Sequence, residues 1–483
     1  MMEAVIMERF ISEGKGNGLR ALREIKPGEV IYSCKPFAFC VARDFLKTAC
    51  QSCLKRGESL SRCSQCKTAR YCSVQCQKQA WPDHKRECKC LKHLQPRIPT
   101  DSVRLVARII FKLLSQSESD QEELYSIAEH QSHLADMSEE KKEGLKHLCT
   151  TLQVYLAEEN CDLSRLPSGL DPVSLLARVT CNCFSISDGE LQDVGVGLYP
   201  RNMFSTIMLQ DRAECVSLSP GRGWLCLTAQ ILHTSTGINR KLLENKSYAG
   251  VTMHGMSLLN HDCQPNCIMM FEGKRLTLRA VRVIRSAEEL TISYTDILAP
   301  SKDRRSQLQE QYHFRCECKR CSTEDKDCEM LSGEKSAWTS IKDSIHHLEQ
   351  LQSEQHWDEL LKESQALLHR HSDVVPDRNI YMLRLLDLAM DACISLDDYE
   401  TALEYGNRAL GPYKLYFSDP HPSRAVELLR VGKLQHFLGR LEEARGSFTQ
   451  AYSIMSVTHG AAHALTNQVQ RRLSECQAEL NTL

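Results

Sequence analysis

Cysteine and histidine residues at short, regular spacings are the most chemically suggestive feature of this sequence. Eight of them lie between residues 50 and 88, as Cys50-x2-Cys53, Cys63-x2-Cys66, Cys72-x3-Cys76 and His84-x3-Cys88. Eight thiolate or imidazole ligands suffice for two tetrahedral zinc sites. Two of the pairs, Cys72/Cys76 and His84/Cys88, have the spacing of one helical turn. Few large apolar side chains lie between them, so we expect metal to replace a hydrophobic core here.

A second set of candidate residues is spread over distant segments. Lys15-Gly16-Asn17-Gly18 is predicted to be a tight glycine turn whose backbone approaches a ligand closely. Later segments are Asn260-His261-Asp262-Cys263-x2-Asn266-Cys267, Glu288-Glu289-Leu290-x3-Tyr294 and Cys316-x-Cys318-x2-Cys321. In this order the later segments match the signature of SET methyltransferase domains.

The chain as a whole resembles the SET-and-MYND (SMYD) family of protein-lysine methyltransferases. Tyr71 before Cys72 and Trp81-Pro82 before His84 make the cysteine-rich segment look like a MYND finger. The resemblance runs from about residue 5 to the C-terminus, and 81–92 and 194–200 carry much of it. It implies a lysine N-methyltransferase with S-adenosylmethionine and three zinc ions as cofactors, acting on lysines of histones and of non-histone proteins.

The resemblance also implies a role for individual residues. One zinc ion is expected on Cys50, Cys53, Cys72 and Cys76, a second on Cys63, Cys66, His84 and Cys88, and a third on Cys263, Cys316, Cys318 and Cys321. The cofactor is expected against Lys15, Gly16, Asn17, Tyr125, Asn182, Asn260, His261, Tyr294 and Phe314. Phe184, Tyr294 and Tyr312 are expected to wall the channel for the substrate lysine, with Tyr294 as the catalytic residue.

Transfer from a methyl sulfonium needs in-line geometry and a neutral amine more than it needs covalent help. A free lysine, with a pKa of about 10.4, is protonated at neutral pH. An apolar aromatic channel beside a cationic sulfonium disfavours the ammonium by desolvation and by like charge. We therefore expect no Asp, Glu or His general base.

The elements that must position these residues predict an α+β fold. Short strands are expected over 1–45, around 195–199, 267–271, 276–283 and 290–294, and helices from Asp101 to about Gln192 and from about Ala337 to the end. The expected architecture is a mainly-β SET domain with an inserted zinc-bound MYND finger, a zinc-bound post-SET tail and a C-terminal α-helical TPR-like domain. The predicted boundaries are 1–49 and 194–298 for the SET domain, 50–88 for the finger, 89–193 for a helical insert, 299–328 for the post-SET segment and 329–483 for the helical domain.

The C-terminal segment contains an internal repeat. Tyr399-x2-Ala402-x6-Ala409 before His421 recurs 42 residues later as Leu441-x2-Ala444-x6-Ala451 before His463. The pattern resembles a tetratricopeptide array with lengthened helices. Such arrays commonly hold peptides on a concave surface, although a helical bundle without a binding role has the same pattern.

Composition limits the remaining possibilities. The formal net charge of -2 and 25% charged residues describe an ordinary soluble protein. Without a signal sequence, the 24 cysteines indicate a reducing compartment, nucleus or cytoplasm. We expect no membrane partner and a monomer. Between Cys50 and Lys92 ten lysines and arginines face three acidic residues, a charge that suits DNA or acidic partners as well as a solvated surface. A catalytically impaired scaffold that binds proteins or DNA is the alternative to an enzyme.

Three positions depart from the family pattern. Ala287 replaces a glycine, so we expect its turn to avoid positive φ. His133 replaces an expected asparagine and is left out of the predicted site. Residues 201–256 form an atypical insertion where the family has about two residues. It is interpreted either as an artefact of the gene model or as a real surface excursion, and it adjoins the segment expected to bind the cofactor.

Overall fold

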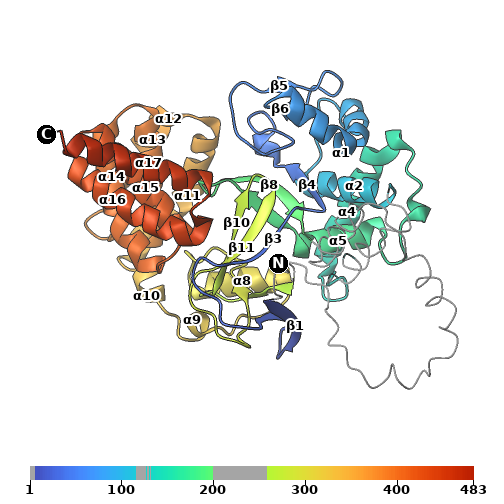
Figure 1. The fold of residues 1–483 in the computed structure, drawn as a ribbon, viewed down its shortest axis with the longest axis horizontal. Coiled ribbons are helices and arrows are strands. Elements are labelled where there is room, and N and C mark those ends of the chain that lie inside the picture. The colour runs from blue at the N-terminus through green and yellow to red at the C-terminus, as the bar shows by residue number, and fades with distance from the viewer. Residues whose placement is uncertain (1–5, 116–126, 128–129, 131, 200–257, 483) are drawn as a thin grey trace, which may run out of the picture.

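The computed structural model describes residues 6–115, 127, 130, 132–199 and 258–482. The insertion at 201–256 and the predicted cofactor residue Tyr125 lie outside the described residues. Figure 1 shows small sheets at the centre, the cysteine-rich segment and several helices beside them, and a stack of C-terminal helices on the other side.

Short paired strands form the central part. They are β1 (Met7–Ser12), β2 (Gly16–Ala21), β3 (Val30–Cys34), β4 (Ala38–Val41), β7 (Phe184–Ser187), β8 (Asp193–Leu198), β9 (Asn260–His261), β10 (Cys267–Glu272), β11 (Arg275–Ala280) and β12 (Thr291–Ile292). Their orders are β1-β2, β10-β11-β3, β4-β8-β7 and β12-β9, the last pair being parallel. Gly16 and Gly18 lie in β2 rather than in the turn, which residues 13–15 make between β1 and β2.

The cysteine-rich segment consists of loops, the two-residue strands β5 (Ser61–Arg62) and β6 (Arg70–Tyr71), and helix α1 (Val74–His93). Ser73 caps α1, because its hydroxyl accepts a hydrogen bond from the amide of Cys76 at 3.1 Å. Cys76, His84 and Cys88 therefore lie on the helix, whereas Cys72 precedes it. The expectation of one helical turn for Cys72/Cys76 was wrong, because the serine between them starts the helix.

Three helices follow: α2 (Asp101–Leu113), α4 (Glu139–Leu156) and α5 (Pro172–Asn182). Asp171 caps α5, since its carboxylate accepts from the amides of Val173 and Ser174 at 3.0 Å. The helical stretch ends at Asn182 instead of the predicted Gln192. The alternating sequence Phe-Ser-Ile-Ser forms β7 there, with Ile186 fully buried between partly exposed neighbours.

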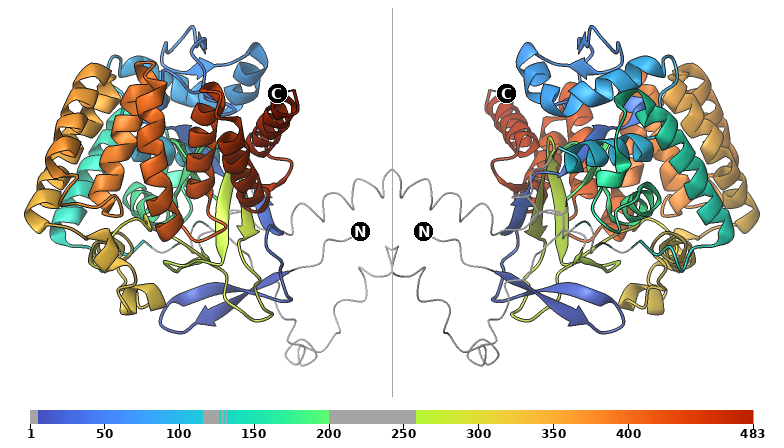
Figure 2. Two further views of the ribbon diagram at one scale, coloured as in Figure 1. Left: turned by 90° about the vertical axis from the view of Figure 1, so that its left-hand side faces the viewer. Right: turned by 90° about the vertical axis from the view of Figure 1, so that its right-hand side faces the viewer.

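Beyond β12, helices α8 (Ser301–Tyr312), α9 (Lys319–Ser322) and α10 (Asp327–Met330) lead to the helical array. The array consists of α11 (Lys335–Glu354), α12 (Trp357–His371), α13 (Ile380–Ser395), α14 (Tyr399–Tyr416), α15 (Pro422–Phe437), α16 (Leu441–Met455) and α17 (Ala464–Leu480). Figure 2 shows these helices side by side. Among the described residues, no helix is both long and apolar enough to cross a membrane.

The repeat in the sequence corresponds to two helix pairs, α14–α15 and α16–α17. Its small residues lie at the contacts between helices, because Ala402, Ala409, Ala444 and Ala451 are at most 1% exposed. Its histidines are equivalent caps: the Nδ1 atoms of His421 and His463 each accept from the amide two residues on, at 3.2 Å.

The array lies against the turn between β7 and β8. His459, in the π-helical turn Ser456–Gly460 after α16, is 3.2 Å through Nε2 from the carbonyl oxygen of Gly189. Lys433 of α15 lies 3.6 Å from the carboxylate of Glu190 in the same turn. The array therefore contacts the part of the molecule that carries the predicted site.

Candidate functional site

The twelve predicted zinc ligands lie in three groups of four. Within each group the potential ligand atoms are all within 4.8 Å of one another. The groups are Cys50, Cys53, Cys72 and Cys76; Cys63, Cys66, His84 and Cys88; and Cys263, Cys316, Cys318 and Cys321. Neighbouring sulfurs are 3.5 to 3.7 Å apart. Four thiolates about 2.3 Å from one zinc ion would have sulfurs about 3.8 Å apart. The spacing of these donors therefore fits tetrahedral zinc.

The second group is supported by buried charged residues that the sequence analysis did not single out. Nδ1 of His84 lies 3.4 Å from the carboxylate of Glu87, while Nε2 lies 3.6 Å from the sulfur of Cys66. Arg108 of α2 donates to Glu87 at 2.5 Å, and Arg104 lies 3.5 Å from it. A carboxylate on the outer nitrogen of an imidazole orients the other nitrogen toward a metal. The position of Glu87, three residues after His84, was the available signal.

Arg304 supports the third group from helix α8. Its side chain is fully buried, and its guanidinium lies 3.3 Å from the sulfur of Cys263 and 3.5 Å from that of Cys321. A cation here offsets the excess negative charge of four thiolates around one divalent ion. No spacing rule identifies an arginine in this role, so sequence reasoning missed it.

Pairing of β9 with β12 brings two segments of the sequence signature together in space. Asn260 lies opposite Thr291, and His261 lies opposite Ile292. The amide of Tyr294 then donates to Nδ1 of His261 at 2.9 Å. The Tyr294 hydroxyl donates to the carbonyl oxygen of Leu259. Burial, with the neighbouring Tyr312, raises the pKa of Tyr294, so its phenol stays neutral.

The β1–β2 hairpin reaches the same place through polar contacts. The Asn260 amide nitrogen donates to the carbonyl oxygen of Asn17 at 3.1 Å and to the carboxylate of Glu289 at 2.8 Å. Lys15 forms an ion pair with Glu289 at 3.3 Å. A Cβ at Gly18 would come within 2.9 Å of both the Asn260 amide and the Glu289 carboxylate. Only glycine fits this junction without displacing these groups.

Aromatic rings complete the site. The ring centroids of Tyr294 and Tyr312 are 4.8 Å apart, and Phe314 lies 6.3 Å from Tyr294 and 6.0 Å from His261. Tyr312 ends α8, and His313 turns the chain with a φ of 60°. Burial raises the pKa of Tyr312 to about 12 and lowers that of His261 to about 4, so both are uncharged at neutral pH.

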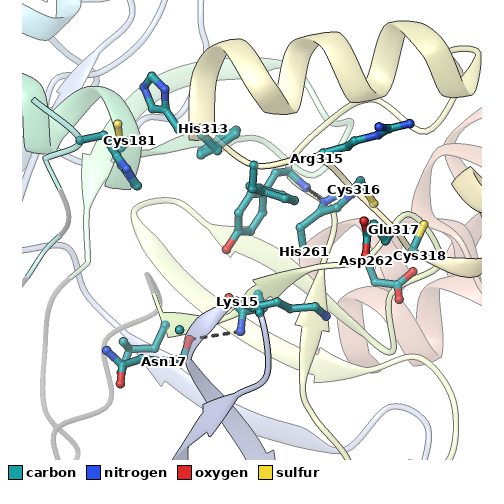
Figure 3. Close-up of a pocket in the computed structure, with 18 of the residues that line it drawn as sticks. Lys15, Asn17, Cys181, His261, Asp262, His313, Arg315, Cys316, Glu317 and Cys318 are labelled. Carbon is teal, nitrogen blue, oxygen red and sulfur yellow. Dashed lines mark hydrogen bonds between the residues drawn. The ribbon is translucent and has the colours of Figure 1, made fainter. Parts of the chain in front are cut away.

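These groups surround a cavity of about 710 Å³. Figure 3 shows Lys15 and Asn17 on one side of it and His261 and Cys316 on the other. Nine of the predicted cofactor and channel residues line it: Lys15, Gly16, Asn17, Asn182, Asn260, His261, Tyr294, Tyr312 and Phe314. Phe184 is not part of the described lining, and its ring packs 6.2 Å from that of Tyr199.

Three histidines outside the predicted site also line the cavity: His130, His133 and His313. His133 was left out of the predicted site, but it lies in the wall with His130, and its ring centroid is 5.1 Å from that of His313. The sequence comparison considered His133 by residue type alone. Its position next to the end of α8 depends on tertiary structure.

Ala287 adopts the conformation that its identity argued against, with a φ of 64°. The amide of Glu288 donates to the carbonyl oxygen of Arg285 at 3.1 Å, which closes a reverse turn with Ala287 at its third position. The Ala287 amide also donates to Ala21 of β2 at 2.8 Å. These contacts fix a turn that requires positive φ, so the prediction for this residue was wrong.

Sequence comparison with known proteins shows the family of the whole chain. A model of the SET domain matches residues 16–295. Human and mouse histone-lysine N-methyltransferase SMYD3 are each 41% identical to this chain over 479 residues, covering 99% of both sequences. The chain belongs to the SMYD family. Human N-lysine methyltransferase SMYD2 is 30% identical over 483 residues, covering 97% of this chain and 98% of its own.

A solved SET domain of LSMT bound to lysine and AdoHcy covers 100% of this chain and 90% of its own. Its TM-score is 0.33 and its identity 12%, a likeness too weak to inform the fold or the site. SMYD membership, with a SET domain and three groups able to hold zinc, identifies the chain as a lysine methyltransferase. A catalytically impaired scaffold is not favoured.

Proposed function

We propose that this SMYD chain transfers a methyl group from S-adenosylmethionine to the ε-amine of a lysine in a protein, within the cavity around Tyr294. The convergence of Asn260 and His261, the β1–β2 hairpin and the aromatic residues of the α8 end on one cavity is the observation that carries the proposal. A volume of about 710 Å³ is in the usual range for small-molecule sites.

Lys15, Gly16, Asn17, Asn182, Asn260, His261, Tyr294 and Phe314 would hold the cofactor, with Phe314 available to stack on an aromatic base. When bound, the cofactor supplies an electrophilic methyl group on a sulfonium. Gly16 has no atom within 4 Å of the place a Cβ would occupy, so the hairpin backbone is open to the cavity. Asn260 is held rigidly by Asn17 and Glu289, which fixes its amide as a binding group.

Tyr294 and Tyr312, together with Phe184, would wall the path of the lysine. Burial raises the pKa values of Tyr294 and Tyr312, so the two phenols are neither acids nor bases at neutral pH. Their work is to orient the amine and to exclude water. Desolvation between the rings lowers the pKa of the incoming ammonium, which frees the lone pair needed for attack. The displaced proton leaves to solvent without a general base.

The test compares Tyr294→Phe with Tyr416→Phe in the full chain. The hydroxyl of Tyr416 in α14 also donates to a carbonyl oxygen, that of Arg378, but lies in the array. With labelled cofactor and a panel of histones and other proteins, Tyr294→Phe is expected to lose at least 90% of methyl transfer and to bind cofactor within about threefold of the parent. Tyr416→Phe should keep full activity. Normal turnover in Tyr294→Phe would remove this residue from the mechanism.

We further propose that lysines of histones and of non-histone proteins are the substrates, as the names of the 41% and 30% identical relatives suggest. We assign the chain to nucleus and cytoplasm and expect a monomer. The helical array is proposed to bind peptides, and the basic surface of the zinc finger remains a proposed contact for DNA. Radiolabelled methyl incorporation into purified histones, with and without DNA, tests the substrate and the DNA contact together.

A further inference from the structure

Two cysteines of the third zinc group are also part of the wall of the cavity around Tyr294. Cys316 and Cys318 line this cavity, and Figure 3 shows both side chains at its edge. Cys318 is partly exposed, whereas Cys263 and Cys321 are at most 1% exposed. A small molecule that enters the cavity can therefore reach half of the ligands of this group without any unfolding of the chain.

The two buried cysteines and the two at the cavity differ in their partners. The guanidinium of Arg304 lies 3.3 Å from the sulfur of Cys263 and 3.5 Å from that of Cys321. In the part of the chain that the structure describes, no arginine or histidine side chain donates to the sulfur of Cys316 or Cys318. A hydrogen bond from a cation stabilises a thiolate and makes it less nucleophilic. The two cavity cysteines are therefore the more reactive half of the group.

This arrangement has the features of an oxidisable pair of cysteines. A cysteine that binds zinc is deprotonated, and the thiolate is the form that oxidants attack. Oxidation favours an accessible thiolate with a second cysteine beside it. Cys318 meets both conditions, because it lines the cavity and its sulfur lies within 4.8 Å of that of Cys316. Cys181 lines the same cavity, but burial raises the pKa of its thiol, which therefore stays protonated and less reactive.

We propose that Cys318 and Cys316 form an oxidation site, which a peroxide reaches through the cavity and which a bound cofactor shields. The Cys318 sulfur attacks one peroxide oxygen, the O–O bond breaks, and a hydroxide leaves, so that Cys318 becomes a sulfenic acid. The Cys316 sulfur then attacks the Cys318 sulfur, the S–S bond forms, and the sulfenic oxygen leaves as a second hydroxide. The two thiolates lose two electrons, and the peroxide gains them. Only the shielding rests on the proposed function.

Oxidation of this pair removes two of the four ligands of the third zinc group. The two cysteines that remain are too few for a tetrahedral zinc site, so the ion is lost. Tyr312 and Phe314 pack against this group and precede it directly in the chain. Their places in the cavity therefore depend on the reduced state of the pair. A thiol reductant together with zinc restores the site, because a disulfide is reversible.

The test exposes the zinc-loaded full chain to hydrogen peroxide, blocks the remaining thiols and identifies the oxidised peptides by mass spectrometry. Trypsin releases the two cavity cysteines in one peptide, 316–319, and two cysteines of the first zinc group in another, 71–78. The second peptide is the internal control, because its Cys72 is exposed outside the cavity. We expect a disulfide within 316–319. S-adenosylhomocysteine at ten times its Kd should slow its formation about tenfold and leave 71–78 unaffected.

Two variants separate the zinc ligand from its neighbours in the cavity. Cys318→His keeps a zinc ligand but removes the oxidisable thiolate, so after the same exposure it should retain about one zinc ion per chain more than the parent. Cys181→Ser is the matched control and should lose zinc like the parent; slower loss in this variant would show that the first oxidised thiol is a different one. A colorimetric chelator measures the released zinc.

The parent chain alone decides the proposal if a variant fails to fold. A reduced 316–319 peptide, under peroxide that oxidises 71–78, would overturn the oxidation site. Calorimetry measures separately whether S-adenosylhomocysteine binds. Binding without slower oxidation of 316–319 would overturn the shielding, whereas absence of binding would overturn the proposed function and the shielding with it. The disulfide in 316–319 tests the oxidation site in either case.

Discussion

The zinc finger and the helical array bury very different residues. In the finger, Cys50, Cys63, Cys66, His84 and Cys88 are each at most 4% exposed. In α13 of the array, eleven of sixteen residues are buried, and all of them except Asp387 are apolar. Potential zinc ligands therefore occupy much of the interior of the finger, whereas apolar side chains fill the interior of the array.

The two regions therefore owe their stability to different interactions. Metal binding stabilises a finger by on the order of 10 kcal/mol and lets it fold without a hydrophobic core. The array depends on repeated close contacts, each contributing on the order of 1 kcal/mol. The cavity around Tyr294 depends on metal-based stability, because the third cysteine group packs against the segment that carries Tyr312 and Phe314.

Removal of zinc should produce the largest contrast. A strong chelator is expected to unfold residues 50–88 and to abolish methyl transfer, while leaving α11 to α17 folded. Hydrogen exchange resolved by peptide, with metal content measured alongside, checks this. We expect about three zinc ions per chain before treatment. Equal loss of protection in the finger and the array would show that the two regions are not independently stabilised.

Raising the pH should weaken the array through Asp387. Burial and Glu427 raise the pKa of this carboxyl to about 8, above its value of about 4 in an unfolded chain. The folded state therefore holds the proton more tightly, so this contribution is full below about pH 4 and is lost as the pH rises through about 8. Asp387→Asn should flatten the profile and add ~2 kcal/mol at pH 8 to 9. Urea unfolding at several pH values measures it, and parallel profiles for parent and variant would contradict it.

Close packing in the array should make it sensitive to one methyl group. A Cβ at Gly432 of α15 would lie 2.7 Å from a ring carbon of Phe448 in α16. Gly432→Ala should therefore cost about 1–2 kcal/mol, despite the better helix propensity of alanine. Gly446→Ala is the matched control, because no atom lies within 4 Å of its Cβ position. It should stabilise α16 by about 0.5–1 kcal/mol. Thermal unfolding midpoints of both variants test this, and equal shifts in the two variants would contradict the close contact at Gly432.

The smallest effect is expected at Ala287. Glycine tolerates its φ of 64°, whereas alanine in the left-handed region costs about 1 kcal/mol. Glycine also raises the conformational entropy of the unfolded chain, which offsets part of this gain. The free energy of unfolding should therefore rise by about 0.5 kcal/mol in Ala287→Gly. Ala478→Gly, at an exposed position inside α17, should instead lose about 0.5–1 kcal/mol. Denaturant titration of both variants gives the comparison.

The sequence predicted a feature well where the signal lies in residues close together in the chain, and poorly where it depends on contacts between distant segments. The cysteine spacings predicted two zinc sites, and the 42-residue period predicted the repeated helices, because both signals are local. Arg304 and His133 were missed, since each meets its partners only after distant segments fold together. Ala287 was predicted wrongly for the same reason: its conformation is fixed by Ala21 on another strand.

The ion pair between Lys15 and Glu289 joins residues 274 positions apart in the chain. A ribosome that adds about 5–20 residues per second needs roughly 14–55 s to make the second residue after the first. During that time the β1–β2 hairpin has been synthesised but lacks the strand that Arg20 contacts through Glu289. The hairpin therefore waits for this partner during much of the synthesis of the chain, an interval in which a chaperone can protect it.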